Sequence, residues 1–163
     1  MRGYFGIGME GVSKAMNLGA LMRTANAFGA SFFFTVDAEP RLRDIYRSDT
    51  SKSAEAMPFY QWDTVADMVL PRAARLVGVE LTDDAIALPA FAHPKSAVYV
   101  LGRERGSLSE AMQDRCEFIV KIPTRFCLNV GLAGALVMYD RLLVHGQHPP
   151  RPVSPGPGRR LSR

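Results

Sequence analysis

The order of apolar and polar residues along the chain predicts strands and helices in alternation. Residues 31–36 form a continuous aromatic and β-branched run, which is typical of a strand buried on both faces of a parallel sheet. In residues 17–28 the apolar positions recur at helical spacing, and Gly29 stands where it can end that helix. Further strands are predicted at residues 4–9, 75–80, 97–101 and 118–122, and further helices at residues 63–70 and 109–115. This alternation predicts an α/β fold with a mainly parallel sheet flanked by helices.

The last predicted helix, residues 129–145, is apolar on nearly all sides. One stripe contains Leu132 and Leu136, and a second contains Val137 and Met138. A helix that is apolar all round must be buried on several sides. Its two glycines permit a close approach of another backbone. We therefore expect this helix to pack against both its own sheet and a partner surface.

Length and composition fit one globular domain followed by a short tail. The 163 residues are 47% hydrophobic and 22% charged, which suits a chain with an apolar core. Residues 147–163 are rich in Pro and carry four Arg and no acid, so they account for the whole formal net charge of +4. We expect a domain over residues 1–146 and a disordered tail over residues 147–163. The tail is either a solvated end without a role or an arm that attracts phosphate.

Several classes of protein are disfavoured by what the sequence contains. No apolar stretch approaches the roughly 20 residues that span a bilayer, and the N-terminal residues do not resemble a secretory signal, so we expect a cytoplasmic protein. Cys116 and Cys127 have neither disulfide nor metal-site spacing, and no metal is expected. A nucleophile motif such as GxSxG is missing, which argues against a triad hydrolase.

A glycine pattern near the N-terminus offers one alternative function. Gly6, Gly8 and Gly11 spell GxGxxG after a predicted strand, and Asp37 ends the next strand, as in a dinucleotide-binding fold. However, only five residues precede Gly6, and Asp37 lies further from Gly11 than the roughly 20 residues usual for that fingerprint. An NAD-binding dehydrogenase domain therefore remains as the alternative.

A first candidate site lies on the helix written NLGALMRTANAFGA, which carries Asn17, Gly19 and Arg23. Arg23 lies away from the apolar face of this helix, one turn beyond Gly19, whose missing side chain leaves space beside it. Arg23 is therefore able to reach a ligand. An ordinary solvated arginine behind an Asn17 N-cap has the same pattern.

Two more candidate sites follow predicted strands. The segment VLGRERGSLS places Glu104 in a glycine-bracketed turn, and ligands of parallel sheets bind at the carboxyl ends of strands. The segment KIPTRFCLNVG places Asn129 at the start of the last helix, where free N–H groups favour a carboxylate or an oxyanion. A helix cap and an inert Cys127 explain the same residues equally simply.

In order and spacing, these three segments resemble the motifs of the SpoU/TrmH class in the SPOUT superfamily of RNA methyltransferases. The matches are Asn17, Gly19 and Arg23 with AFG, then LGRERGSLS, then IP followed by LNV, and together they cover residues 4–141. The family usually has Ser where this chain has Cys127, and Cys is the poorer hydrogen-bond donor. The resemblance implies a C-terminal trefoil knot, which general rules of chain topology make very rare, and a homodimer packed through it.

The resemblance also implies a function and a set of site residues. The expected activity is transfer of a methyl group from S-adenosyl-L-methionine to a ribose 2′-hydroxyl, most often in tRNA for members without an extra RNA-binding domain. A catalytically inactive RNA-binding module is a further alternative. The implied cofactor-binding residues are Leu81, Gly102, Ile122, Cys127 and Leu128. The implied catalytic residues are Arg23, Asn17, Glu104 and Asn129, with Arg23 reaching toward the partner's cofactor. The family often assigns this arginine as the base, but a guanidinium keeps its proton at neutral pH, so we expect a protonated Arg23 to hold a phosphate instead.

Contacts to RNA are expected from a basic segment after the second strand. This segment contains Arg41, Arg43, Arg47 and Lys52. Such residues bind phosphates without reading base sequence. A solvated charge run has the same composition, and the sequence leaves both readings open.

Overall fold

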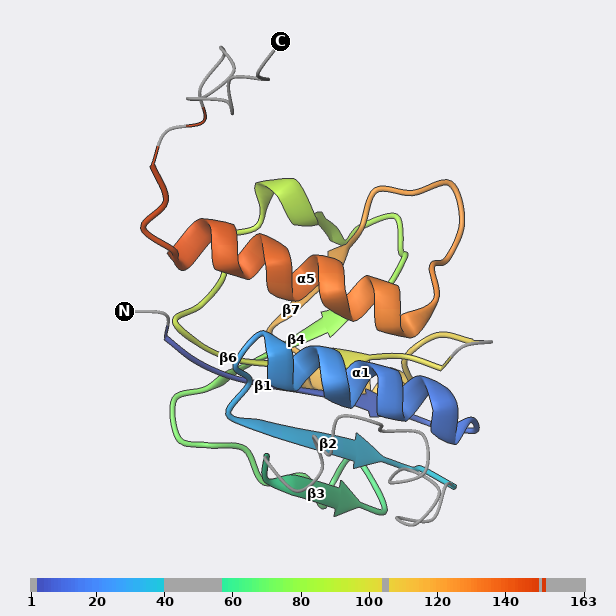
Figure 1. Cartoon of the computed structure of the whole chain (residues 1–163). Helices are drawn as coiled ribbons and strands as arrows, with labels where there is room; N and C mark the ends of the chain where they lie inside the picture. Colours follow the sequence, from blue (N-terminus) through green and yellow to red (C-terminus); the bar gives the residue numbers. More distant parts are fainter. Residues whose placement is uncertain (1–2, 40–56, 104–105, 150, 152–163) are drawn as a thin grey trace, which may run out of the picture.

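The computed structural model describes residues 3–39, 57–103, 106–149 and 151. Glu104 and most of the proposed tail lie outside these residues. So do the proposed RNA-binding residues Arg41, Arg43, Arg47 and Lys52. Figure 1 shows the described chain as a twisted sheet with α1 and α5 lying side by side. The prediction of an α/β fold with a parallel sheet is confirmed.

Among the described residues, seven strands form one sheet in the order β3-β2-β1-β6-β4-β7-β5, and all neighbouring strands are parallel. The strands are β1 (Tyr4–Glu10), β2 (Phe32–Val36), β3 (Phe59–Trp62), β4 (Arg75–Val79), β5 (Ile86–Ala87), β6 (Ser96–Leu101) and β7 (Phe118–Lys121). The central strands β1 and β6 are buried along most of their length, which explains their near-continuous apolar sequences.

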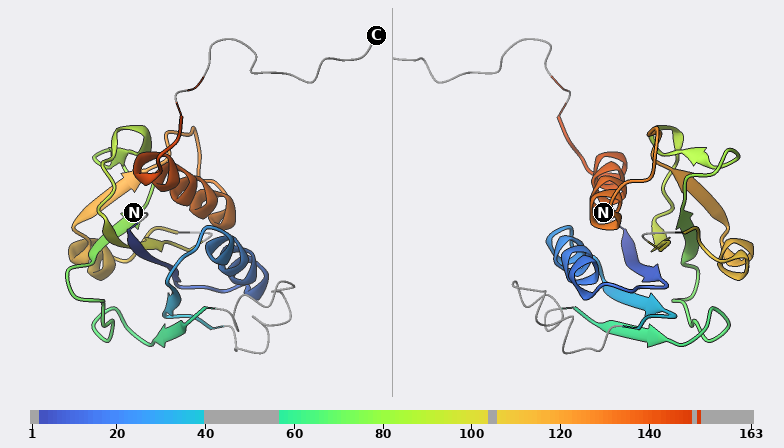
Figure 2. Two further views of the ribbon diagram at one scale, coloured as in Figure 1. Left: turned by 60° about the vertical axis from the view of Figure 1, so that its left-hand side comes forward. Right: turned by 90° about the vertical axis from the view of Figure 1, so that its right-hand side faces the viewer.

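Helices cover both faces of the sheet. α1 (Ala15–Ala27) and α5 (Val130–His145) lie on one face, and α4 (Glu110–Arg115) lies on the other (Figure 2). α1 and α5 approach closely at Gly134, where an added Cβ would lie 2.3 Å from Leu21 Cδ1. Gly134 thus leaves room for the Leu21 side chain of α1, rather than for another backbone as expected. The sheet and these helices form two apolar clusters, one on each face.

Two of the three glycines of the GxGxxG pattern belong to the sheet, and only Gly11 lies in the turn after β1. Gly6 and Gly8 lie inside β1, and added Cβ atoms would lie 2.2 Å from Phe32 Cζ and 2.2 Å from Phe34 O. Missing side chains at these positions leave room for strand β2 and its aromatic rings. The geometry thus gives no support to the dinucleotide-binding alternative.

One predicted helix is wrong, and several short elements escaped prediction. Residues 63–70 form turns, in which Thr64 Oγ1 donates to Asp67 Oδ2 at 2.6 Å. The Arg115 guanidinium donates to the carbonyls of Val65 and Met68, so tertiary contacts satisfy groups that a helix would have paired internally. Strands β3 and β5 and the 3-10 turn η1 (Leu88–Ala90) were not predicted.

The ends of the two long helices differ in part from expectation. α1 begins at Ala15 with Lys14 in the N-cap position, so Asn17 lies in the first turn and is not the cap. Asn129 does cap α5, and Gly29 follows α1 with a φ of 76°. In the single chain α5 is buried along one face only, since Leu132, Leu136 and Tyr139 are 62%, 43% and 48% exposed. Its burial on several sides is therefore not achieved within this chain.

The described residues contain neither a membrane-spanning helix nor a metal-binding cluster. None of their helices has the length and apolar character needed to cross a membrane. No cluster of three or more His, Cys, Asp or Glu side chains suited to a metal ion occurs in that part of the chain.

Candidate active site

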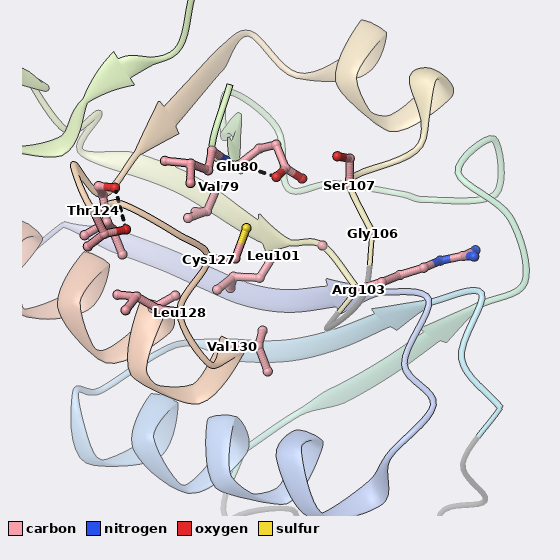
Figure 3. Close-up of a pocket in the computed structure, with 14 residues that line it drawn as sticks. Val79, Glu80, Leu101, Arg103, Gly106, Ser107, Thr124, Cys127, Leu128 and Val130 are labelled. Carbon is pink, nitrogen blue, oxygen red and sulfur yellow. Dashed lines mark hydrogen bonds between the residues drawn. The ribbon is translucent and has the colours of Figure 1, made fainter. Parts of the chain in front are cut away.

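A cavity of about 270 Å³ lies at the carboxyl ends of β4, β6 and β7, against the start of α5 (Figure 3). Ligands of open parallel sheets bind at this edge. All five residues expected to hold the cofactor line it: Leu81, Gly102, Ile122, Cys127 and Leu128. Its other lining residues are Val79, Glu80, Leu101, Arg103, Gly106, Ser107, Thr124, Val130 and Ala133. Three loops that are distant in sequence therefore converge on one hollow, although their binding role stays a prediction.

Glu80 ties two walls of this cavity together. Its Oε1 accepts a hydrogen bond from Leu81 N at 3.0 Å, and its Oε2 accepts one from Leu108 N at 2.8 Å. Gly102 lies beside this carboxylate, since an added Cβ would lie 3.2 Å from Glu80 Oε2. The carboxylate thus fixes the backbone after β4 relative to the loop after β6. A carboxylate holding two backbone N–H groups gives the cavity a preformed shape.

A second carboxylate fixes the same loop from the side of β1. Glu10 is only 3% exposed, and its two oxygens accept hydrogen bonds from Ser109 N at 2.8 Å and Ser109 Oγ at 2.5 Å. Ser109 Oγ in turn accepts from Met112 N at 3.1 Å and caps α4. The loop between β6 and α4 is therefore held at both Leu108 and Ser109. These two anchors were missed in the sequence, because only the fold brings the strand ends to the loop.

The opposite wall is the loop between β7 and α5. Thr124 closes it locally, with Thr124 N donating to Ile122 O at 2.7 Å and Thr124 Oγ1 donating to Phe126 O at 2.9 Å. Cys127 follows this turn and is exposed, with its side chain lining the cavity (Figure 3). The position where the family usually has Ser thus faces the candidate cofactor site.

Asn129 connects the start of α5 to α1. Its Oδ1 accepts from Gly131 N at 2.9 Å and Leu132 N at 3.4 Å, which caps the helix. Its Nδ2 donates to Asn17 Oδ1 at 3.5 Å, so the first and third motifs meet here. Both side chains also line a neighbouring hollow of about 680 Å³ beside the cofactor cavity.

Arg23 lies apart from these groups within the chain. It is exposed on α1 and does not line the cofactor cavity. The structure thus brings Asn17 and Asn129 together with the cavity but leaves Arg23 at a separate exposed position. Glu104, the remaining expected catalytic residue, lies outside the described residues.

A buried polar cluster lies away from the cavity, between β6 and the C-terminal half of α5. His93 pairs through Nδ1 with Tyr99 OH at 2.6 Å and through Nε2 with Asp140 Oδ2 at 2.9 Å. Arg141 donates to Pro94 O at 2.6 Å and to Tyr99 OH at 3.2 Å. Burial raises the pKa of Tyr99 to about 12, and burial lowers the pKa of His93 despite the opposing effect of Asp140. The cluster fastens α5 to the sheet.

A family model described as the SpoU rRNA Methylase family matches residues 5–139, which is most of the chain. The chain belongs to this family. The second and third of the motifs recognised in the sequence contribute loops to the cavity, whereas the first lies on α1 beside it. In this member of the family, the described residues form a seven-stranded parallel sheet with flanking helices.

Curated SpoU relatives are similar over most of the chain. The 23S rRNA (guanosine-2′-O-)-methyltransferase RlmB of Coxiella burnetii is 27% identical over 139 residues, covering 81% of this chain and 55% of the relative. The tRNA (guanosine(18)-2′-O)-methyltransferase of Escherichia coli is 25% identical over 138 residues, covering 81% of this chain and 60% of the relative. The chain thus spans little more than half the length of these relatives.

Solved structures agree on the fold. The SpoU methyltransferase AviRb from Streptomyces viridochromogenes, in complex with the cofactor AdoMet, matches with a TM-score of 0.75 at 21% identity, covering 86% of this chain and 60% of AviRb. A structure concerned with the 2-OH methylation of C/U34 on tRNA matches with a TM-score of 0.72 at 22% identity. It covers 87% of this chain and 91% of the other.

Proposed function

We propose that this chain is an S-adenosyl-L-methionine-dependent RNA methyltransferase that modifies a ribose 2′-hydroxyl. The observation that carries the proposal is the convergence of Leu81, Gly102, Ile122, Cys127 and Leu128 on one cavity at the carboxyl edge of the sheet. These residues come from three loops and were selected by family resemblance alone, so a shared cavity is an independent geometric argument. Membership of the SpoU family and the AdoMet-bound relative add to it.

The lining of the cavity suits an adenosine group. Apolar side chains such as Leu101 and Leu128 offer surfaces for a flat base, and backbone groups of the converging loops offer polar contacts. Glu80 links the two loops through its hydrogen bonds and also contributes a negative charge to the cavity. A negative charge there favours a sulfonium cation over a neutral thioether.

The proposed mechanism depends on orientation rather than on a strong base. S-adenosylmethionine supplies the methyl group, and the protein must hold the hydroxyl in line with it. A guanidinium keeps its proton at neutral pH, so Arg23 binds the adjoining phosphate and stabilises negative charge that develops on the oxygen. Asn129, held by its cap bonds and by Asn17, fixes the position of the loop that ends at α5. The phosphate or water accepts the proton.

The proposal includes a homodimer with shared sites. Three exposed apolar side chains of α5, Leu132, Leu136 and Tyr139, give a single chain more apolar surface than solvent favours. A two-fold interface over α5 would cover them by one self-complementary contact. In the same dimer Arg23, which does not line its own cavity, would face the cavity of the partner. The trefoil knot implied by the family belongs to this proposal too.

tRNA is the proposed substrate, and the cytoplasm the proposed location. The Escherichia coli relative acts on tRNA, and the C/U34 tRNA structure is covered over 91% of its length, so a chain of this size has a tRNA-directed counterpart. The Coxiella burnetii relative acts on 23S rRNA, which makes rRNA the second candidate.

The proposal is tested by ligand binding and by methyl transfer. Calorimetry should detect S-adenosylmethionine binding and no preference for NAD. Labelled cofactor and unmodified tRNA should then give label in an alkali-resistant dinucleotide, which marks a ribose 2′-oxygen. Label on a base would refute the proposed chemistry, and label only on rRNA would refute the proposed substrate. RNA binding without any transfer would instead support the inactive-module alternative.

A further inference from the structure

Arg103 lies on the boundary between two cavities. It lines the 270 Å³ candidate cofactor cavity and also a neighbouring cavity of about 500 Å³ at the carboxyl ends of β1 and β2. The second cavity is polar and charged, with Ser13, Lys14, Asp37 and Glu39 among its lining residues. In Figure 3 the Arg103 side chain extends away from Cys127 and Leu128, out of the cofactor cavity. Its charged end therefore belongs to the second cavity.

The Arg103 side chain lies against Gly11 and ends at Asp37. Arg103 passes over Gly11, where an added Cβ would lie 2.0 Å from Arg103 Nε, and it ends with Nη2 donating to Asp37 Oδ2 at 2.7 Å. Gly11 has a φ of 66°, and Asp37 has a φ of 51°, which is uncommon for a residue with a side chain. Backbone conformations of this kind cluster at functional sites. An ordinary surface ion pair needs neither of them.

We propose that Arg103 binds a phosphate of the RNA next to the methylated nucleotide, and that Asp37 orients the Arg103 guanidinium for this contact. This inference rests on the proposed function, because it names a substrate contact of the same site. Guanidinium groups bind phosphate through two parallel N–H donors, and Asp37 occupies only one of the five donors in the described contacts. Because the pair is exposed, a phosphate can displace the Asp37 carboxylate from Arg103 or share the guanidinium with it.

Placement favours RNA over the cofactor as the ligand of Arg103. The methylated ribose must lie at the mouth of the cofactor cavity, so its flanking phosphates fall just outside that cavity. The second cavity lies there and shares Arg103 with the first. Asp37 and Glu39 repel a phosphate unless a cation lies between the carboxylates and the phosphate, and Arg103 is a cation in direct contact with Asp37.

Salt dependence of RNA binding tests the proposal. An unmodified tRNA transcript serves as the probe, because phosphate contacts do not depend on base sequence. With Arg103→Gln, the slope of log binding constant against log salt should become shallower by about 0.7, the value per phosphate contact in single strands. Arg103→Lys should keep the slope, because it keeps the charge. Asp37→Asn should tighten RNA binding at low salt, opposite to Arg103→Gln.

Arg75→Gln is the matched control. The Arg75 side chain is 56% exposed against 50% for Arg103, and it also pairs with an exposed carboxylate. However, Arg75 is the first residue of β4, so it lies at the amino ends of the strands, opposite the two cavities. Its replacement should leave the slope unchanged. An unchanged slope in Arg103→Gln, with wild-type RNA binding and methyl transfer intact, overturns this inference alone. Loss of S-adenosylmethionine affinity in Arg103→Gln without a change in RNA binding would make Arg103 a cofactor ligand instead. A wild-type protein that binds no RNA overturns both proposals.

Discussion

Asn129 Nδ2 donates a hydrogen bond to Asn17 Oδ1 at a distance of 3.5 Å, which joins the N-terminus of α5 to the first turn of α1. The same Asn129 side chain caps α5 through its oxygen. One residue thus has a structural function through its acceptor and a site function through its donor. The two functions are chemically separable, because Asp keeps the acceptor and removes the donor.

Asn129→Asp should therefore fold as the wild type does but lose activity. The cap survives, so we expect the free energy of unfolding to stay within about 0.5 kcal/mol of the wild type, whereas Asn129→Ala should lose about 1 kcal/mol. Methyl transfer should fall by about 10-fold or more in both variants, because the loop before α5 loses its tie to Asn17. Chemical denaturation and single-turnover assays measure the two effects. Full activity of Asn129→Asp would show that the Asn17 contact has no part in catalysis.

The buried His93 should make stability fall in acid. Burial lowers the pKa of His93 from 6.5, so the unfolded chain takes up a proton at a higher pH than the folded chain. The neutral form therefore stabilises the fold above about pH 6.5, and this stabilisation is lost as the pH falls toward the lowered pKa. The free energy of unfolding should drop by up to about 1.4 kcal/mol per pH unit for this group.

Replacing His93 with Gln isolates that effect. The variant should be less stable at neutral pH, because contacts to Tyr99 and Asp140 are disturbed, but its unfolding free energy should depend less steeply on pH below 6.5. Denaturant titrations at a series of pH values give the slopes. Parallel curves for wild type and variant across the acid range would rule out His93 as the source. His145, whose pKa burial also lowers, would then be the next candidate.

The two cysteines should differ in reactivity, and the cofactor should protect one of them. Cys116 is partly buried, and burial, aided by the nearby Glu10, raises its pKa to about 12, so little thiolate forms at neutral pH. Cys127 is exposed and lines the candidate cofactor cavity. Iodoacetamide should therefore label Cys127 selectively, and S-adenosylmethionine should slow that labelling while NAD does not. Peptide mass spectrometry reads the site. Equal labelling rates with and without S-adenosylmethionine would place the cofactor elsewhere.

Periodicity predicted the long elements because their burial is local and regular. β1, β2, β6 and α1 each carry an apolar pattern that matches the surface they bury, whereas α5 also carries apolar residues on a face that the single chain leaves exposed. The segment 63–70 has helical spacing, yet Thr64 and Asp67 pair with each other and Arg115 binds nearby carbonyls. β3 is short and, within the described residues, lies at the end of the sheet beside β2, and its burial pattern does not alternate. Both errors have tertiary causes that no local pattern contains.

The site was predictable only to the extent that motifs mark it. Family resemblance selected Leu81, Gly102 and Leu128, and the fold brings them to one cavity. Glu10 and Arg103 were not singled out, because their partners Ser109 and Asp37 are distant in sequence. A buried Glu at the end of an apolar strand was the one available signal. Charged residues at strand ends of a parallel sheet merit attention for this reason.

In the proposed dimer each active site is built from two chains. If Arg23 acts at the cavity of the partner, Arg23→Ala and Asn129→Ala damage different halves of each site. Both homodimers should be nearly inactive. Mixing them under conditions that allow subunit exchange produces heterodimers in which one site carries both substitutions and the other carries neither. Since exchange makes about half of the dimers mixed, roughly a quarter of wild-type activity should return.

The control is a second mixture, in which Asn129→Ala is combined with Asn17→Ala. Asn17 and Asn129 are hydrogen-bonded within one chain, so they belong to the same half-site. Each heterodimer then has two damaged sites, and activity should not return. Native mass spectrometry verifies exchange, and circular dichroism verifies the fold of each variant. Recovery in the Arg23 mixture alone supports a site built from two chains. If exchange is complete and neither mixture recovers, Arg23 serves the cavity of its own chain and the shared arrangement is wrong.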